Sequence, residues 1–565
     1  MGLTAALNIA GKSLELFSAG IQVAGNNISN SSSPDFIREK LILQTSFPIQ
    51  SGSLIFGSGA TAVGIKQQID KFLEQRLYTA SSDFFGSDAR NSIYKQLDSA
   101  LQELGDSDLS TQFNDLLGKF NDLVNQPELA TNRELVVRQT QQFADAVVNL
   151  RTRIDRLRSD FGVQMNDLVT EANRLIDQIS DLNPKITAME ASGLLQSDAG
   201  AMRSQRYAAL NRLSQIIPIR TIEHPTGGID VFLGNDDLVI PGKTQHLETI
   251  PSVDRGVVVA QVRVQGASDT LSGTQGQING TIFGRDNVLG GFIDKLDQFT
   301  SNLIYEVNKI HSSGQGMHGF SSVTGTYGIM DPNASLDASG LAFKPQHGSF
   351  QVTIKNQSTG ATQTSTINID LDGIGGPNTT FNDLLGQLNG VANVSATMTP
   401  DRKLSLSAAT GYEISFSNDT SGALASLGIN TLFTGSSSRD IGVNSVVTKD
   451  STMLAAGQGG GPGDGSNAAR IAAIADTSIA GLNGVTPTTF YQTMLSSLAQ
   501  SSASESAVSA GYKSFRDSLL SQRSQYSGVS LDEETIDIMK YQHSYQVAAK
   551  FISTIDQLFT TLLQV

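Results

Sequence analysis

Two narrow apolar stripes, one at each end of the chain, constrain the fold more than any other feature. The first stripe consists of Leu3, Leu7, Ala10, Leu14, Phe17, Ile21, Ala24 and Ile28, and the last of Ile538, Tyr541, Tyr545, Ala548, Ile552, Ile555, Phe559 and Leu562. Steps of three and four residues alternate in both, which is the spacing of a coiled-coil seam. Each stripe is too slight to hold a lone helical hairpin firmly in water.

We therefore predict that the terminal helices, about 3–28 and 531–563, pair and bury their stripes against neighbouring subunits. The residues predicted to form this subunit interface are Leu7, Leu14, Ile21, Ile28, Ile538, Tyr545, Ile552 and Phe559. In the isolated monomer we expect both ends to be largely disordered.

Turn-forming and capping residues set the inner ends of these two helices. The segment NNISNSSSP at 26–34 stops the first helix, because Asn and Ser bond to nearby backbone and Pro34 biases Ser33 away from helix. The segment Ser530-Leu531-Asp532-Glu533 is a capping box, which marks the start of the last helix.

Further helical patterns follow the first stripe. Short stripes at 93–104 and 113–123 come before a second capping box at 131–134. That box opens the longest pattern of the chain, which reaches residue 182 and approaches Pro184. Helix returns at 292–311 and again from residue 467 to the C-terminus. A pattern this long favours an elongated bundle over a compact globule.

The β-like segments lie in the middle of the chain. Short alternating runs with Gly and Pro turns begin near residue 217, and the stretch 335–455 is rich in Thr, Ser, Asn and Gly. Within it, TINIDLD at 366–372 alternates strictly, and LSLSAATGYEISFSND at 404–419 is typical of a hairpin. The segment GQGGGPGDG at 457–465 is typical of a flexible linker.

The order of these segments predicts an α+β multidomain fold that is elongated, with domains made from N- and C-terminal pieces together. Residues 1–70 and 516–565 would form a terminal coiled-coil polymerisation domain. Residues 71–334 and 456–515 would form a helical bundle domain with a small β region near 217–285, and residues 335–455 an outward β-rich insert domain.

Charge and cysteine content exclude several partners and site types. The net charge is −15, which argues against nucleic acid and anionic membrane as partners. Charged residues make up only 16% of the chain, well below the usual share of about 25%, so much of the surface is uncharged and packs with little charge desolvation. The absence of Cys excludes disulfides and thiolate sites. We also see no transmembrane run and no Sec signal.

No motif predicts an active site. Gly11-Lys12-Ser13 lacks the earlier glycine of a phosphate-binding loop, because that position is Ala6. The run at 368–373 resembles the start of a calcium loop, but Thr379 stands where the loop needs Glu, so a polar strand and turn is favoured. His311 and His318 have no ligand cluster around them. We predict no catalytic, cofactor or metal residues, and no cofactor.

Both ends of the chain resemble the signatures of bacterial flagellar axial proteins, the family of rod, hook and junction subunits. Asn26, Asn27, Asn30, Pro34, Phe36 and Arg38 are similar to the N-terminal pattern NNIANxxTxGYxR, and residues 530–563 to the C-terminal one. Asn308, His311, Gly314 and the phrase LGINTLFTG at 427–435 also fit. Ser29, Ser33 and Asp35 depart from the usual Ala, Thr and Gly. The resemblance implies that the N-terminal motif is an elbow between the inner helix and the segment leading to the outer domains.

The resemblance also implies a role. The chain would be a non-enzymatic structural part of the extracellular flagellum, exported by the flagellar type III route and needed for flagellum assembly and motility. It would form a ring or helical layer at the hook–filament junction. Its partners would be copies of itself, the hook protein, the second junction protein, and a cytoplasmic export chaperone at the C-terminal helix. The alternatives are another axial protein, such as hook protein, the other junction protein or a flagellin-like protein, or an adhesive or hydrolytic module on an axial scaffold.

Overall fold

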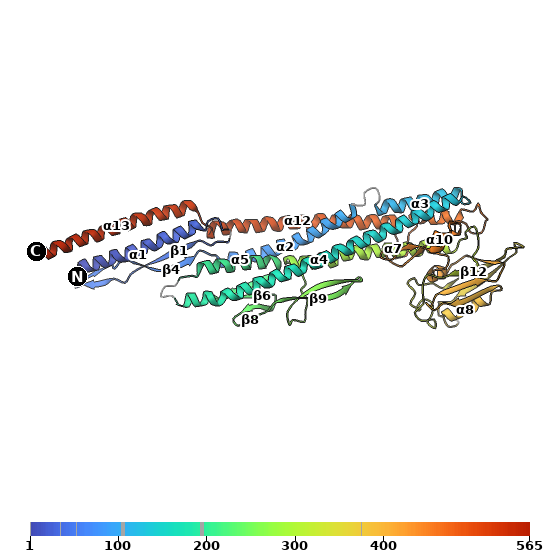
Figure 1. The fold of residues 1–565 in the computed structure, drawn as a ribbon, viewed down its shortest axis with the longest axis horizontal. Helices are drawn as coiled ribbons and strands as arrows, with labels where there is room; N and C mark the ends of the chain where they lie inside the picture. The colour runs from blue at the N-terminus through green and yellow to red at the C-terminus, as the bar shows by residue number, and fades with distance from the viewer. Residues whose placement is uncertain are drawn as a thin grey trace. The chain divides into compact units, whose positions relative to one another are not determined.

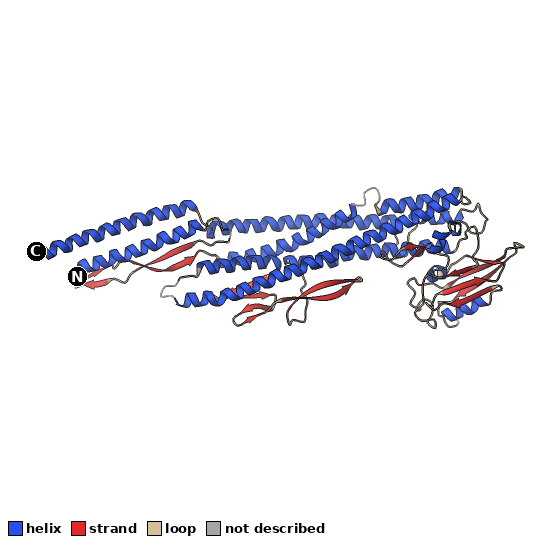
Figure 2. Cartoon of the chain, in the orientation of Figure 1, coloured by secondary structure: helices blue, strands red, loops and turns tan. Residues whose placement is uncertain are grey.

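The computed structural model describes residues 2–33, 35–51, 53–102, 108–192, 197–374 and 376–564 (Figures 1 and 2). It has the predicted α+β class, with long helices and several small antiparallel sheets. The chain forms two compact units, each made of separate pieces. Unit 1 comprises Met1–Ile93, Ser159–Asp286 and Ser502–Val565, and unit 2 comprises Tyr94–Arg158 and Asn287–Ser501. The predicted division into three domains stays a prediction.

The two terminal helices lie in unit 1 and have the predicted inner ends. Helix α1 (Gly2–Ser29) ends inside the Asn- and Ser-rich segment, and helix α13 (Leu531–Gln564) begins directly after Ser530. The Ser530 Oγ accepts a hydrogen bond from the Glu533 N–H at 3.5 Å, so one half of the capping box is present. The two helices pack against each other within one chain (Figure 1).

A β-hairpin follows α1 and folds back along it. Strand β1 (Glu39–Thr45) pairs with β4 (Ala60–Gln67), with an irregularity between Ile42 and Leu43. Two shorter strands, β2 (Ile49–Ser51) and β3 (Leu54–Phe56), continue the hairpin beyond them. Both β1 and β4 contact α1, which therefore packs against the hairpin as well as against α13.

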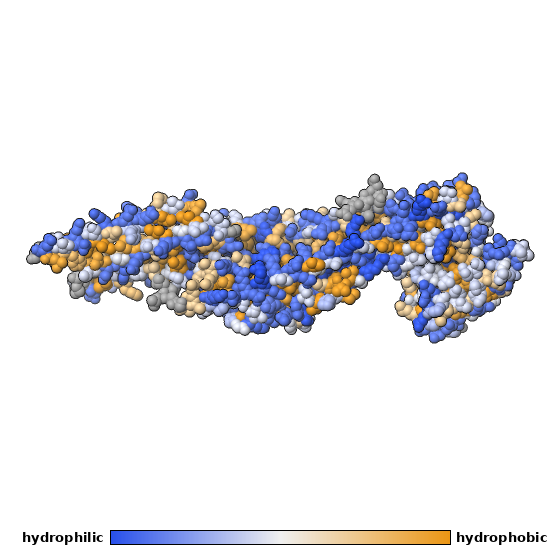
Figure 3. Space-filling view, viewed as in Figure 1, coloured by the Kyte–Doolittle hydropathy of each residue, from blue (hydrophilic) through white to orange (hydrophobic). Residues whose placement is uncertain are grey.

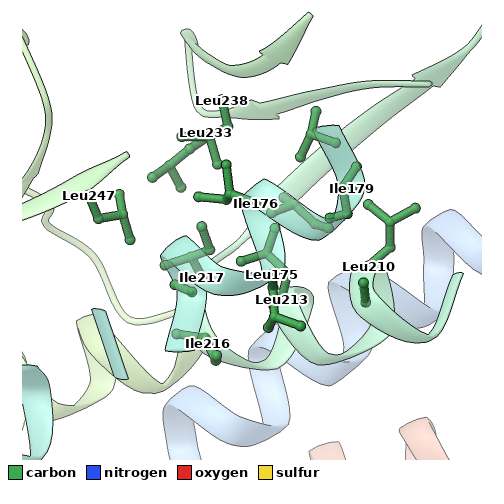
Figure 4. Close-up of a cluster of buried hydrophobic side chains, with 14 of the residues drawn as sticks. Leu175, Ile176, Ile179, Leu210, Leu213, Ile216, Ile217, Leu233, Leu238 and Leu247 are labelled. Carbon is green, nitrogen blue, oxygen red and sulfur yellow. The ribbon is translucent and has the colours of Figure 1, made fainter. Parts of the chain in front are cut away.

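The main core of unit 1 is built from helices and the predicted β region near residue 217. The helices are α2 (Lys71–Gln102), α4 (Ala130–Ser192), α5 (Gly200–Ile216) and α6 (Gly276–Phe283). The strands are β5 (Ile219–Glu223), β6 (Ile229–Leu233), β7 (Asp236–Ile240), β8 (Lys243–Thr244), β9 (Leu247–Asp254) and β10 (Val257–Val264). Figure 4 shows Ile176 of α4 and Leu213 of α5 in the core that these elements share with Leu238 of β7. Helix α12 (Pro487–Ser527) packs on α2 in a separate small cluster, through Leu519.

One expectation for α4, the capping box at 131–134, is wrong. The helix begins at Ala130, so Thr131 lies inside it, and Glu134 pairs with Arg138 one turn later rather than closing a capping box. The helix also continues through Pro184 to Ser192. A proline interrupts a helix by removing one hydrogen bond. Here Leu182 and Ile186, on either side of it, are buried in a small core cluster, and this packing holds the helix together.

Unit 2 combines a helical part with a β-rich part. Its helices include α3 (Leu109–Asn125), α7 (Gly290–Ser312) and α11 (Ser466–Ala472), and a π-helix η2 (Gly284–Leu289) precedes α7. Shorter helical turns are α9 (Ala423–Leu427), α10 (Ser445–Lys449), η3 (Ser451–Met453), η4 (Ala473–Asp476) and η5 (Ala480–Leu482). Strands β17 (Phe433–Thr434) and β18 (Gly442–Val443) pair with each other.

The β-rich part contains two three-stranded sheets and a helix. One sheet has the order β13 (Thr362–Ile369), β12 (Gly348–Asn356), β16 (Tyr412–Ser417), and the other β11 (Ser322–Thr324), β15 (Leu404–Ala408), β14 (Val394–Met398). Apolar side chains of both sheets share a core with α8 (Phe381–Asn389). The predicted hairpin at 404–419 is wrong, because β15 and β16 are consecutive but pair in different sheets.

The glycine-rich segment at 457–465 is not a free linker. Gly457 exchanges two backbone hydrogen bonds with Gln315, and the Asp464 carboxylate accepts hydrogen bonds from the N–H groups of Gln458, Gly460 and Ser466. Partial burial raises the pKa of Asp464, but these bonds outweigh it and hold that pKa well below its usual range. A single carboxylate therefore fixes the loop, which composition alone did not reveal.

Candidate assembly interface

The α1–α13 pair includes a close contact in which a glycine of α1 faces an aromatic ring of α13. The ring of Tyr541 lies against Gly20, where a Cβ atom would come within 2.8 Å of the ring carbons. Phe17 also contacts this ring, with the two centroids 6.5 Å apart. Burial raises the pKa of Tyr541, and the charges of Asp537 and Glu534 raise it further, so the phenol stays neutral. Glycine at this position thus allows the two helices to approach closely.

A polar cluster ties the inner ends of the two helices together. The Asn27 side chain donates to the Glu534 carboxylate at 3.0 Å and to the Glu39 carbonyl at 2.8 Å, and its oxygen accepts from the Glu39 N–H at 3.0 Å. Arg38 forms ion pairs of 2.6 Å with both Glu533 and Glu534. We call Asn27, Arg38, Glu39, Glu533 and Glu534 the Asn27 cluster. Its members come from α1, the elbow, β1 and α13, so it fixes the angle at which the chain leaves α1.

The most buried carboxylate of this cluster, that of Glu534, is paired with the positive charge of Arg38. Burial lowers the pKa of Arg38, but its hydrogen bond to Glu533 and the charge of Glu534 outweigh that effect and raise it overall. Burial raises the pKa of Glu39, against a smaller opposing effect of the hydrogen bond from Asn26. The Glu534 side chain is almost fully buried, and a buried carboxylate is tolerated only when it is paired and hydrogen-bonded.

The remaining elbow residues have lesser contacts. Asn30 donates to the carbonyl and side-chain oxygens of Asn26 and so caps the end of α1. Phe36 is half-buried and Pro34 lies outside the described residues. Ile37, which the sequence analysis did not single out, is buried in the main core of unit 1. The elbow is therefore anchored by Ile37 and by the backbone N–H of Arg38, which donates to the Ser527 carbonyl.

The eight predicted interface residues are only partly covered in the single chain. Leu14, Ile21, Ile28, Ile538, Ile552 and Phe559 are half-buried in the single chain, and Leu7 and Tyr545 are exposed. On α1 the buried residues include Gly20, Val23 and Asn27. At 3.6 residues per turn, the side of the helix that these three residues share is rotated by roughly a quarter of a turn from the predicted stripe. The α1 stripe is thus only partly used by α13, and its assignment to a subunit interface stays a prediction.

Sequence reasoning missed four of the five residues of a second apolar line on α13, and the fifth, Leu562, also ends the predicted stripe. Ile536, Val547, Phe551, Leu558 and Leu562 are exposed in the single chain and form what we call the outer stripe. Their spacing of four, seven or eleven residues keeps them on one side of the helix, beside the face that contacts α1. The signal was present in the sequence, because α13 carries two apolar stripes, and only the stripe with regular seam spacing was recognised. Apolar side chains are visible along the α1–α13 pair in Figure 3.

Two internal segments quoted for the resemblance contact each other in unit 2. The Asn308 oxygen accepts from the N–H groups of Leu432 and Phe433, and its amide donates to the Phe433 carbonyl. His311 Nδ1 lies 2.8 Å from the Asn430 carbonyl, and Nε2 accepts from the Ala455 N–H at 3.0 Å. Helix α7 thus holds the phrase at 427–435 through side-chain bonds, which identifies a structural role for both landmarks.

One group of possible metal ligands occurs among the described residues. His347, Asp370 and Asp372 place ligand atoms within 4.8 Å of one another, at the surface of the β-rich part. The His347 Nδ1 already accepts a hydrogen bond from the Leu371 N–H at 3.3 Å. Strand β13 ends at Ile369, so the strand covers only the first two residues of the run at 368–373. A membrane-crossing helix of sufficient length and hydropathy is not found among the described residues.

Comparison with known protein families gives two matches along the chain. The model described as "Flagellar hook-associated protein FlgK helical domain" matches residues 94–326. The model described as "Flagellar basal body rod FlgEFG protein C-terminal" matches residues 520–565, which include all of α13. The second description names basal body rod proteins, whereas the first names a hook-associated protein.

Two characterised relatives carry the name flagellar hook-associated protein 1. The protein of Escherichia coli (strain K12) is 22% identical over 578 aligned positions that cover 100% of both chains. The protein of Bacillus subtilis (strain 168) is 24% identical over 231 positions, which cover 39% of this chain and 45% of that relative. The chain therefore spans less than half of the Bacillus protein in this alignment and the full length of the Escherichia protein.

The fold is also similar to a solved structure, that of the flagellar hook junction protein FlgK from Burkholderia pseudomallei. The similarity has a TM-score of 0.50 at 16% identity and covers 81% of this chain and 100% of that chain. The helical-domain match, the full-length relative and the signatures joined in the Asn27 cluster agree, and the chain is similar along its whole length to flagellar hook-associated protein 1.

Proposed function

We propose that this chain is a structural subunit of the bacterial flagellum that forms the junction layer between hook and filament. The observation that carries the proposal is the α1–α13 pair, which joins both ends of the chain and leaves apolar side chains exposed on each helix. Surfaces of this kind are covered by other molecules in an assembly. Similarity to flagellar hook-associated protein 1 supports the flagellum as the place of assembly.

The layer requires contacts between different patches of successive subunits. Such heterologous contacts generate rings or helices, whereas a contact between identical patches closes at a dimer. The predicted interface residues of α1 and α13, including Leu7, Ile21 and Tyr545, remain accessible enough to take part. Hook protein on one side and the second junction protein on the other are the proposed neighbours of the layer.

Export and chaperoning belong to the proposal as well. The chain would leave the cell through the flagellar export apparatus. Before export, a cytoplasmic chaperone would cover α13, whose outer stripe is an exposed apolar surface in the free chain. Similarity to named flagellar proteins supports a structural rather than a catalytic role.

Deleting the gene and restoring it with a tagged copy tests the function. Cells without the chain should keep their hooks but fail to attach filaments and lose motility, and the restored protein should localise to a single band between hook and filament by immuno-electron microscopy. Filaments that remain attached in the deletion strain, or a tag distributed along the filament, would contradict the junction role.

A further inference from the structure

The far end of the hairpin beside α1 exposes an unusual density of apolar side chains. We define the hairpin tip as Phe47, Ile49, Leu54, Ile55 and Phe56, all of which are more than half exposed, with Phe47 at 92%. Soluble monomers rarely present so many large apolar side chains within ten positions of the chain. The tip is therefore a candidate contact surface that neither the family signatures nor the predicted stripes include.

The tip has little stability of its own. Strands β2 and β3 have three residues each, with Ile49 opposite Phe56 and Gln50 opposite Ile55. Among the strands that the structure describes, they form a two-stranded sheet of their own. An isolated two-stranded hairpin is marginal in water and gains stability when its apolar side chains are covered. This arrangement fits a segment that is completed by a neighbour.

The position of the tip follows from the path of the hairpin along α1. The hairpin begins at Glu39, which binds Asn27 near the end of α1, and Gly59 lies beside Ile9 near its beginning. Gly59 has φ +85, and its Cα faces the Ile9 side chain where a Cβ would be 3.3 Å from Ile9 Cγ2. The tip thus lies at the N-terminal end of α1 (Figure 1).

Charge distribution identifies a matching surface on α13. Residues 41–65 contain no Asp, Glu, Lys or Arg, although such residues make up 16% of the chain. The last part of α13, residues 551–564, contains one charged residue, Asp556, and carries Phe551, Leu558 and Leu562 of the outer stripe. Joining the two surfaces buries apolar area with almost no charge desolvation.

We propose that the hairpin tip of one subunit packs on the outer stripe of α13, at Phe551, Leu558 and Leu562, in a second copy of this chain. This inference rests on the proposed function and specifies the contact by which the layer grows. Two different patches meet, so the contact is heterologous and continues from subunit to subunit, as a ring or helix requires. A tip-to-tip contact would instead pair two copies and leave both outer stripes exposed.

Cysteine cross-linking tests this contact, because the natural chain contains no Cys. One full-length variant carries Ser53→Cys at the exposed turn of the tip. The other carries Thr554→Cys, which lies within one turn of Phe551 and Leu558 on the exposed side of α13. The matched control is Gln557→Cys, also exposed on α13 but roughly a quarter of a turn away from the outer stripe. Cells express two variants together, and intact flagella are isolated and treated with a short thiol cross-linker.

We expect the Ser53→Cys and Thr554→Cys pair to give about tenfold more cross-linked dimer than Ser53→Cys with Gln557→Cys, because interface contact raises the effective thiol concentration. Three results would overturn the proposed contact, provided that the chain is present in the flagella. They are equal cross-linking in both mixtures, no cross-linking, and dimers formed by Ser53→Cys alone. Absence of the chain from purified flagella would instead contradict the proposed function, and would therefore contradict the proposed contact as well.

A second measurement separates contact from folding. The double variant Phe47→Ser with Ile55→Ser changes two exposed side chains, so its circular dichroism and thermal transition should match those of the natural chain. Its incorporation into flagella should fall by about tenfold or more if these side chains are central to the contact. Normal incorporation of this folded variant would overturn the inference.

Discussion

The Asn27 amide donates a hydrogen bond to the Glu534 carboxylate at 3.0 Å, across 507 residues of sequence. Both side chains are buried, and each belongs to one of the two terminal signatures by which the family is recognised. Asn27 also uses its oxygen and its second N–H to bind the backbone of Glu39. One side chain therefore joins α1, β1 and α13, and the two signatures form a single structural element within one chain.

Replacing Asn27 tests this joint directly. Asn27→Ala leaves the Glu39 N–H and one oxygen of Glu534 without their partner, which costs about 1–3 kcal/mol for buried groups. Hydrogen exchange should become faster in both α1 and α13, whereas α7 in unit 2 should exchange as before. Asn26→Ala is the matched control, because Asn26 is exposed and makes a longer bond of 3.3 Å to Glu39. Unchanged protection in Asn27→Ala would show that the joint contributes nothing to pairing.

A second prediction concerns the close approach at Gly20. Gly20→Ala places a Cβ atom 2.8 Å from the Tyr541 ring, so the helices must separate or the ring must move, at a cost of about 1–3 kcal/mol. Gly25→Ala on the same helix meets no atom within 4 Å and should stabilise α1 by about 0.5–1 kcal/mol. Hydrogen exchange of α13 should therefore accelerate in the first variant only. Equal effects of the two substitutions would mean that α1 and α13 do not pack as described.

The elements with long regular patterns could be predicted from the sequence. Helices α1, α7 and α13 were located to within a few residues, because apolar spacing and capping residues depend only on local sequence. The pairing of β15 and β16 in different sheets could not be predicted, because a short turn between two strands does not reveal which sheet each strand joins. The fixed conformation of the loop at 457–465 was not predicted, because it depends on the hydrogen bonds of one side chain, Asp464.

The assembly surface was only partly predictable for a related reason. Seam spacing located the stripes on α1 and α13. Gly20, which lies against the Tyr541 ring, contributes no apolar side chain, so a search for apolar periodicity does not detect it. The Asn27 cluster could not be derived from periodicity either, because its members lie up to 507 residues apart. Its charged residues look like ordinary capping groups until the fold brings them together.

A third prediction concerns pH and rests on His311, which is fully buried. Burial lowers its pKa to about 4, and the hydrogen bond to the Asn430 carbonyl offsets this only in part. Between pH 6.5 and pH 4 the unfolded chain binds a proton at this position and the folded chain does not. The stabilisation is therefore present above pH 6.5 and is lost as pH falls toward 4, by up to about 3 kcal/mol.

Hydrogen exchange at α7 and at 427–435 should reveal this loss. Protection corrected for the intrinsic pH dependence of exchange should fall between pH 7 and pH 4.5. His311→Gln should lower protection at pH 7, because the bonds to Asn430 and Ala455 are weakened, and should make the remaining protection less sensitive to pH. A natural chain whose corrected protection is flat over this interval would contradict the assigned role of His311.

The last prediction separates contacts within one chain from contacts between copies, using two residues three positions apart on α13. Ile555 is 2% exposed and faces α1, whereas Leu558 is 50% exposed and belongs to the outer stripe. Ile555→Asp buries a carboxylate in an apolar contact, and should release the α1–α13 pair in the monomer at a cost of at least about 3 kcal/mol. Leu558→Asp should change monomer stability by only about 0.5 kcal/mol, because the side chain is at the surface. It should nevertheless block incorporation into flagella, because the charge would have to be buried between subunits.

The comparison uses hydrogen exchange on the purified monomer and the amount of each variant in isolated flagella. Normal incorporation of Leu558→Asp would remove the outer stripe from the interface, and an intact helix pair in Ile555→Asp would show that the ends do not depend on each other before assembly.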